Sequence, residues 1–413
     1  MIKKLSGLTL LAGALLVGAC HEDGTLNPPA TPAGGELMAR YVAMGNSITA
    51  GYQSAGINDS TQRQSYAYLI AQSAGAPYYY QRLQGRGCAP PFTNNVTQAR
   101  VGGGTAGTCD LVAPSEKPWL SNVAVPGARM EEATTNFDST GGVPTSASNP
   151  LTTFILGGKT QADVMEEANP TLVTVWLGNN DVLGSLTSSA NPGTPLLVTP
   201  TVKFQQAFDA LAARLDGTGA KVMVIGAADV TAIPYSSYGY IIWCAKTGLC
   251  GSPAAPLPPT FIVSNNCAPD AAVPGAKGDS ILVPWTKFVP LIGAAAAGAT
   301  DTLDCSVDAN VVTPSEYATL RTAVSDFNAY MSVQAAAHGY DYWDPNPTLL
   351  ALKGTGQVPV FPDLSALGTG GSVGFGTYFS LDGVHPSATG QKLIADSVAA
   401  HLNAAFGTTI PTP

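Results

Sequence analysis

Residues 41–49 read YVAMGNSIT, a short apolar run that ends in Gly-Asn-Ser. A continuous apolar run of this length is typical of a strand buried on both faces of a parallel sheet. Similar runs lie at 122–125 (NVAV), 172–178 (LVTVWLG) and 221–226 (KVMVIG), and a fifth candidate lies at 340–343. We therefore expect a parallel sheet of about five strands.

Apolar residues with helical spacing separate these runs. Phe204, Phe208, Leu211 and Leu215, for example, recur at intervals of three and four and would share one helix face. Helices are predicted at 64–74, 160–169, 204–215, 317–331 and 393–402, with Ser387 as the N-cap of the last. Because strands and helices alternate, the sequence predicts an α/β fold.

Two intervening stretches, near 78–118 and 232–312, are unusually long. They contain six of the seven cysteines, namely Cys88, Cys109, Cys244, Cys250, Cys267 and Cys305. We expect two insertions held by disulfides on a single sheet, because an even set of cysteines outside the cytoplasm indicates disulfide pairing. Six cysteines allow fifteen pairings, among which sequence does not choose, and pairing of neighbours is the least entangled.

The composition limits the class of protein. Of the 413 residues, 45% are hydrophobic, which supplies a sizeable core and excludes a disordered chain. The formal charge of −9 argues against a nucleic-acid partner. No C-x-x-C or H-x-x-x-H spacing occurs, so we expect no metal site. Length alone suggests two or three domains.

The N-terminus has the layout of a secretory signal. Lys3 and Lys4 precede an apolar run that is too short to span a bilayer, and small residues lead to Cys20. This pattern resembles a bacterial lipoprotein signal, which implies cleavage after residue 19 and acylation of Cys20. The alternative is an ordinary signal peptide that contains a cysteine. Residues 20–39 are rich in Pro and Gly and indicate a flexible tether.

The lipoprotein resemblance also implies a location. His21 stands where Asp would favour retention in the inner membrane, so the expected site is the bacterial cell envelope, at the outer membrane. The lipid on Cys20 would be the only membrane contact. The leaflet that the protein faces and its oligomeric state are left open.

Polar residues follow three of the predicted strands. Ser47 ends the first strand, Gly127 follows the second, and Asn180 lies in the Gly-Asn-Asn-Asp that ends the third. The carboxyl ends of parallel strands are where open α/β sheets bind ligands. Taken singly, each residue could equally belong to a turn or a helix cap.

Asp382-Gly-Val-His385 lies before the last predicted helix. A carboxylate three residues before a histidine can accept the Nδ1 proton, which leaves Nε2 free as a general base. Of the four histidines, His385 alone combines a loop position with a nearby carboxylate. Together with Ser47, these residues supply the nucleophile, base and orienting acid that acyl transfer requires.

The order GNSI, a glycine after the second strand, GNND and DGVHP resembles the SGNH (GDSL-type) esterases and lipases. By that resemblance Ser47 is the nucleophile, and His385 and Asp382 complete the triad. The oxyanion hole combines the N–H groups of Ser47 and Gly127 with the Asn180 side chain. The implied fold is a flavodoxin-like three-layer α/β/α sandwich, and no metal or cofactor is implied. Asn46 stands where many members have Asp.

The resemblance covers the scaffold but not the insertions. It turns the expected organisation into a signal (1–19), a lipidated tether (20–39), one hydrolase domain (40–404) and a C-terminal tail (405–413). The implied activity is ester hydrolysis through an acyl-enzyme, as a lipase, an esterase or a carbohydrate acyl esterase. The alternatives are a non-catalytic surface binding protein and an acyltransferase.

The substrate is left open between lipid and glycan esters. Aromatic residues precede the Asp382–His385 motif, and we expect Tyr378 or Phe379 to border an acyl pocket, with packing inside the loop as the alternative.

Overall fold

The computed structural model describes residues 31–111, 116–135, 150–251, 255 and 257–413. The predicted signal and Cys20 lie outside these residues. Within the described part of the chain, no helix has both the length and the apolar character needed to cross a membrane.

The central sheet consists of parallel strands whose residues are almost all buried. In spatial order they are β1 (Tyr41–Gly45), β4 (Leu172–Trp176), β5 (Lys221–Ile225) and β10 (Asp341–Trp343). The predicted strand at 122–125 runs along the free side of β1, where Val123 N–H donates to Ala43 O (3.0 Å) and Val125 N–H to Gly45 O (3.2 Å). With that segment included, the order is the 2-1-3-4-5 of flavodoxin-like folds, as expected.

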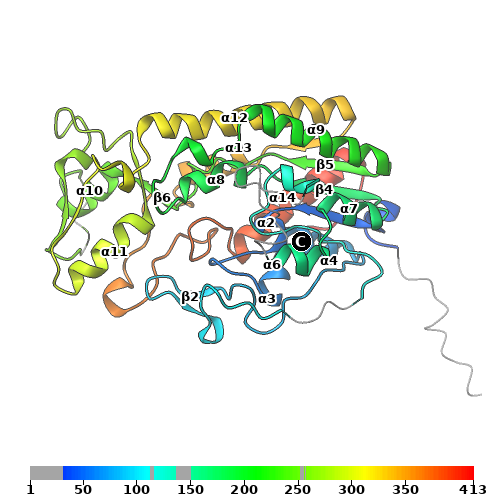
Figure 1. The fold of residues 1–413 in the computed structure, drawn as a ribbon, viewed down its shortest axis with the longest axis horizontal. Coiled ribbons are helices and arrows are strands. Elements are labelled where there is room, and N and C mark those ends of the chain that lie inside the picture. The colour runs from blue at the N-terminus through cyan, green and yellow to red at the C-terminus, as the bar shows by residue number, and fades with distance from the viewer. Residues whose placement is uncertain (1–30, 112–115, 136–149, 252–254, 256) are drawn as a thin grey trace, which may run out of the picture.

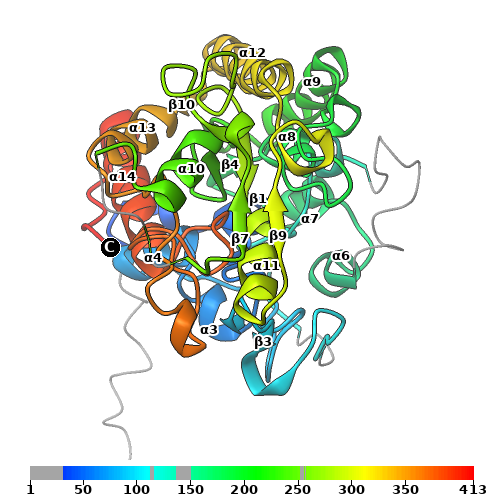
Figure 2. The same cartoon turned by 90° about the vertical axis from the view of Figure 1, so that its left-hand side faces the viewer.

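Helices cover both faces of this sheet (Figure 1, Figure 2). One layer contains α4 (Tyr66–Ala74) and α14 (Ala388–Phe406), and the other α7 (Gln161–Glu167), α9 (Thr201–Thr218) and α12 (Pro314–His338). Alternate strand residues belong to two separate buried clusters, one under each helical layer. The α/β/α sandwich is therefore confirmed.

Local sequence explains where these helices begin and how they pack. The predicted N-cap Ser387 accepts a hydrogen bond from Gly390 N–H, and Thr160 and Thr313 form capping boxes at α7 and α12. The predicted apolar face of α9 packs on α12, where Phe204 stacks on Phe327 with ring centroids 3.9 Å apart. Each of the five predicted helices is present, with bounds shifted by a few residues.

The 232–312 insertion forms one end of the molecule (left in Figure 1, facing the viewer in Figure 2). The insertion contains helices and strands, whereas we had expected it to consist of loops. Its elements are β6 (Ser236–Tyr238), α10 (Gly239–Thr247), β7 (Phe261–Val263), β8 (Leu282–Pro284), α11 (Trp285–Ala296) and β9 (Asp301–Leu303). β6 pairs antiparallel with β8, and β7 pairs parallel with β9.

The predicted pairing of neighbouring cysteines is confirmed. The disulfides join Cys88 to Cys109, Cys244 to Cys250, and Cys267 to Cys305. The first bond closes the 78–118 insertion, which also contains the short strands β2 (Phe92–Asn94) and β3 (Ala99–Arg100).

The remaining helices are short and include several beside the sheet edge. They are α2 (Ser47–Ala50), α3 (Asp59–Gln62), α6 (Pro150–Leu156), α8 (Asn180–Leu186) and α13 (Asn346–Gly354). Near the chain ends, Met38 in a 3₁₀ helix (Gly35–Met38) and Ile410 beyond α14 are buried in the same apolar cluster.

Candidate active site

Ser47 is the first residue of α2, which follows β1 at the carboxyl end of the sheet. The preceding residue, Asn46, is the N-cap of α2, and its Oδ1 accepts from Ile48 N–H at 3.1 Å. The Asn46 side chain also donates to Asn179 Oδ1 (3.3 Å). Ser47 is only 6% exposed.

A buried glutamine that sequence reasoning missed supports the end of β1. Gln161 Oε1 accepts from Gly45 N–H and its Nε2 donates to Gly45 O, each at 2.9 Å. The side chain thereby acts as a short strand partner two residues before Ser47. No local motif signals this role, because α7 lies more than a hundred residues further along the chain.

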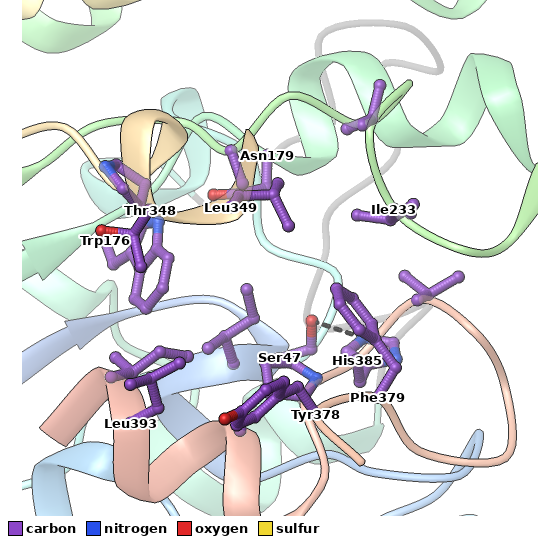
Figure 3. A pocket seen from close by; sticks show the side chains of 18 of the residues that line it. Ser47, Trp176, Asn179, Ile233, Thr348, Leu349, Tyr378, Phe379, His385 and Leu393 are labelled. Atoms are coloured by element: carbon purple, nitrogen blue, oxygen red, sulfur yellow. Dashed lines mark hydrogen bonds between the residues drawn. The ribbon is translucent and has the colours of Figure 1, made fainter. Parts of the chain in front are cut away.

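His385 joins Ser47 to Asp382. Its Nε2 lies 2.9 Å from Ser47 Oγ (Figure 3). Its Nδ1 lies 2.8 Å from Asp382 Oδ2. The Asp–His spacing noted in the sequence therefore brings the two side chains together as expected. With Asp382 on Nδ1, the neutral imidazole presents its unprotonated Nε2 to the serine hydroxyl.

Asp382 is buried but ionised. Burial alone would raise the pKa of this carboxyl group, but the electrostatic interaction with His385 and the hydrogen bonds from His385 and Ala55 outweigh it and lower the pKa to about 2. Ala55 N–H donates to Oδ2 at 2.7 Å, and Val384 N–H and His385 N–H donate to Oδ1. The motif itself supplies most of these donors, whereas Ala55 comes from a distant loop.

The other predicted site residues line a hollow beside Ser47. Gly127 and Asn180 border it together with Ser47, Tyr52 and His385. Gly127 has φ +90°, and an added Cβ would meet no atom within 4 Å, so its backbone conformation rather than space favours glycine. Asn180 Nδ2 donates to Ala128 O at 2.9 Å, which leaves its second N–H for another acceptor.

The first turn of α8 also holds the segment that carries Gly127. Asp181 Oδ2 accepts from Met130 N–H at 2.9 Å, three residues beyond Gly127. Burial raises the pKa of the Asp181 carboxyl group to about 6, although the hydrogen bond from Met130 opposes the shift. Asn180 and Asp181 therefore hold this segment through hydrogen bonds to Ala128 and Met130.

A second, mainly apolar pocket opens on the other side of Ser47 (Figure 3). It encloses about 890 Å³, including the part that is open to solvent. Its apolar lining comes from the ends of β4, β5 and β10, from α13 and from α14, and includes Trp176, Val230, Ile233, Trp343, Leu349, Leu352, Leu393 and Ile394. Tyr378 and Phe379 border it as well.

The described residues contain no group of three or more His, Cys, Asp or Glu side chains placed to hold a metal ion.

The fold and site define a flavodoxin-like α/β protein with a Ser–His–Asp hydrogen-bond chain at the carboxyl edge of its sheet. The family model for GDSL-like lipases and acylhydrolases matches residues 41–398, so the chain belongs to that hydrolase family. No curated protein matches the sequence significantly.

Several solved structures are similar over most of the chain. TesA shares 12% identity, with a TM-score of 0.35, over 89% of this chain and 99% of that chain. An extracellular lipase from Streptomyces rimosus shares 15% identity, with a TM-score of 0.32, over 88% and 98%. A phospholipase A1 from Streptomyces albidoflavus shares 16% identity, with a TM-score of 0.32, over 88% and 98%.

Proposed function

We propose that the protein is a carboxylic ester hydrolase that forms an acyl-enzyme on Ser47. The observation that carries this proposal is the continuous hydrogen-bond chain from Asp382 through His385 to the Ser47 hydroxyl. Such a chain lets a weak nucleophile lose its proton as it attacks. Its position between two pockets supplies space for both parts of an ester.

The proposed reaction runs in two halves. Ser47 Oγ attacks the ester carbonyl carbon while His385 Nε2 takes the hydroxyl proton, and Asp382 stabilises the resulting imidazolium. The oxyanion is held by the N–H groups of Ser47 and Gly127 and by the Asn180 amide. The C–O bond to the alcohol then breaks, and the alcohol leaves with the proton from His385. Water, activated by the same histidine, releases the carboxylic acid.

The apolar pocket supports a fatty acyl group as the acid part of the substrate. Its wall consists largely of aliphatic and indole side chains. Each methylene group of a bound acyl chain that this wall removes from water contributes about 0.8 kcal/mol to the free energy of binding. An acetyl group would leave most of this surface without contact. We therefore favour lipid esters over acetylated glycans.

Hydrolysis of a p-nitrophenyl ester series from acetate to hexadecanoate tests this function. We expect kcat/KM to rise with chain length, and Ser47→Ala to lose activity on every ester. The control is Ser73→Ala, because Ser73 is a surface residue of α4 that donates to Pro411 O. Absence of turnover on the whole series by the folded wild type would contradict the proposal.

We also propose that acylation of Cys20 anchors the enzyme to the bacterial outer membrane. The basic, apolar and small-residue layout before Cys20 supports this location. A Cys20→Ser variant should leave the membrane fraction and lose incorporation of labelled palmitate. Equal palmitate incorporation by the variant and the wild type would contradict the proposal.

A further inference from the structure

A two-residue turn outside the Asp382–His385 motif holds the Asp382 loop. Ala55 N–H donates to Asp382 Oδ2 at 2.7 Å, and Ser54 N–H donates to Ser380 Oγ at 2.8 Å. In return, Leu381 N–H donates to Ser54 Oγ at 3.2 Å. The Ser54–Ala55 turn therefore contacts the carboxylate and the backbone beside it.

The same turn has an unfavourable backbone conformation. Ser54 and Ala55 have φ values of 53° and 52°, in the left-handed region where a Cβ is crowded by the neighbouring carbonyl. Residues in this region persist only where their surroundings hold them. Ala55 N–H is aimed at Asp382 because of this conformation, so whatever holds the turn also holds the carboxylate.

Arg100, on β3 of the 78–118 insertion, contacts the Ser54–Ala55 turn through the Ala55 carbonyl. Its Nη1 donates to Ala55 O at 2.7 Å and to Pro90 O at 2.6 Å, and its Cζ lies 4.0 Å from the centre of the Phe92 ring. Arg100 is only 8% exposed, and no carboxylate among the described residues pairs with it. Burying a guanidinium is costly unless it is hydrogen-bonded, so the Ala55 and Pro90 carbonyls define its position.

Backbone contacts dock the insertion onto the same turn. Phe92 N–H donates to Ser54 O at 2.7 Å, and Ile57 N–H donates to Ala89 O at 2.8 Å. Between them, a Cβ added at Gly56 would come within 2.4 Å of Pro91 N. The two loops thus meet backbone to backbone, and the Cys88–Cys109 disulfide closes the segment that supplies these contacts.

We propose that Arg100 is a positioning residue of the active site. Through Ala55 it holds Asp382 against His385, so that the imidazole stays aligned with Ser47. The 78–118 insertion is then part of the catalytic apparatus, although no residue of the Ser–His–Asp chain belongs to it. This inference rests on the proposed function, since it assigns a role in activating Ser47.

Arg100→Met tests the inference, because Met keeps the apolar stem but donates no hydrogen bond. We expect kcat on a medium-chain ester to fall roughly 10- to 100-fold, as misplacement of a catalytic group does. KM should stay within about twofold, because Arg100 does not line the apolar pocket. The rate of fluorophosphonate labelling of Ser47 should fall with kcat.

The matched control is Arg86→Met in the same insertion, since Arg86 pairs with Asp110, its side chain is 42% exposed, and it contacts neither the Ser54–Ala55 turn nor Asp382 through any hydrogen bond among the described residues. We expect wild-type kcat and KM from this variant. If Arg100→Met does not melt cooperatively, Arg100→Gln replaces it, because its shorter, uncharged side chain cannot bridge both carbonyls. A folded Arg100 variant with wild-type kcat would overturn the inference, and so would an equal fall in the Arg86 control.

A spectroscopic measurement separates this inference from the proposed function. We expect a low-field NMR signal from the proton between His385 Nδ1 and Asp382 in the wild type. This signal should broaden or vanish in Arg100→Met and persist in Arg86→Met. Wild type that hydrolyses no ester would end the proposed function, and this signal would then decide the role of Arg100 alone. An unchanged signal in Arg100→Met would overturn that role.

Discussion

Hydrogen bonds to Asp382 show how single residues shape the site. Among the described residues, five donors reach its two oxygens: Ser380 Oγ, the backbone N–H groups of Ala55, Val384 and His385, and the His385 ring. A carboxylate suits these donors because both of its oxygens act only as acceptors and it carries a full negative charge. An amide would turn one oxygen into a donor that faces other donors.

We therefore expect Asp382→Asn to keep its fold and lose kcat by about 10⁴-fold, because the imidazole would take the wrong tautomer. Asp396→Asn is the control, since Asp396 pairs with Lys392 on the surface of α14. Steady-state kinetics on one ester compare the two. A loss below tenfold in Asp382→Asn would contradict an orienting role for this carboxylate.

The pKa of Asp181 is raised, whereas that of Asp382 is lowered, and substitution of Asp181 should change the free energy of unfolding. Because burial raises its folded-state pKa from 3.8 to about 6, its protonated form stabilises the fold below pH 3.8. That contribution is lost as pH rises through about 6, and two pKa units correspond to about 3 kcal/mol. The free energy of unfolding of Asp181→Asn, measured relative to wild type, should therefore increase from about pH 4 to about pH 7.5.

Urea unfolding at the two pH values measures this difference, with Asp396→Asn as a surface reference. A stability difference between Asp181→Asn and wild type that does not change with pH would contradict the raised pKa.

Ser47, His385 and Asp382 could be predicted because each lies in a short sequence motif whose neighbouring residues belong to the same candidate site. Gln161 and Ala55 were not predictable in this way. Each acts from a position remote in sequence, and only the folded chain brings its amide group to Gly45 or Asp382. Arg100 was missed for the same reason, since its partners are backbone carbonyls that any residue supplies.

At the scale of elements, α13 and α14 decide the shape of the apolar pocket. Leu349 of α13 and Leu393 of α14 both line it, and Figure 3 shows them with Ser47 in the same view. α14 was predicted from its periodicity, whereas α13 was not, and none of its nine residues is fully buried. The helix that borders the apolar pocket was thus harder to find than those that build the core.

Leu349→Trp should shorten the usable acyl chain. A larger side chain would exclude about two methylene groups, each worth about 0.8 kcal/mol, so kcat/KM for dodecanoate should fall roughly tenfold with little change for acetate. The adjacent Leu350→Trp is the control, because Leu350 is 48% exposed and does not line this pocket. An unchanged chain-length profile in Leu349→Trp would place the acyl group elsewhere.

At the scale of the whole molecule, each disulfide closes a loop within one insertion, on a fold whose strands were predictable from the sequence. The three-layer arrangement was implied by the family resemblance, whereas the strands, the helices and the α/β class followed from hydrophobic periodicity, which reports burial directly. The secondary structure of the 232–312 insertion did not, because its strands have three residues each and carry too few side chains to show a period. Cysteine positions were the main signal there.

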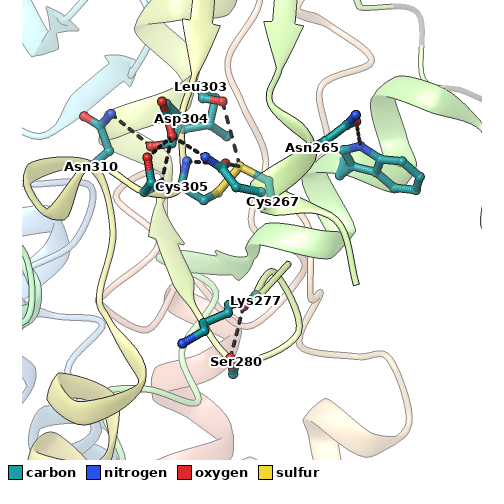
Figure 4. Close-up of a disulfide and its surroundings, with 11 residues drawn as sticks. Asn265, Cys267, Lys277, Ser280, Leu303, Asp304, Cys305 and Asn310 are labelled. Carbon is teal, nitrogen blue, oxygen red and sulfur yellow. Dashed lines mark hydrogen bonds between the residues drawn. A yellow bond between two sulfur atoms is a disulfide. The ribbon is translucent and has the colours of Figure 1, made fainter. Parts of the chain in front are cut away.

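The Cys267–Cys305 bond, which lies beside Leu303 and Asp304, should stabilise the fold more than Cys244–Cys250 (Figure 4). The two bonds close loops of 38 and 6 residues, and chain entropy assigns them about 4 and about 2 kcal/mol. Urea unfolding of the paired Cys→Ala variants measures the loss. The reverse order of stabilities would contradict this expectation.

Covalent labelling of the purified wild type with a fluorophosphonate tests most directly whether Ser47 is a nucleophile activated by His385. Peptide mass spectrometry should find one adduct per chain, on Ser47, with no adduct in Ser47→Ala and a strongly slowed reaction in His385→Ala. An adduct on another residue, or equal labelling of Ser47→Ala, would contradict the proposed mechanism.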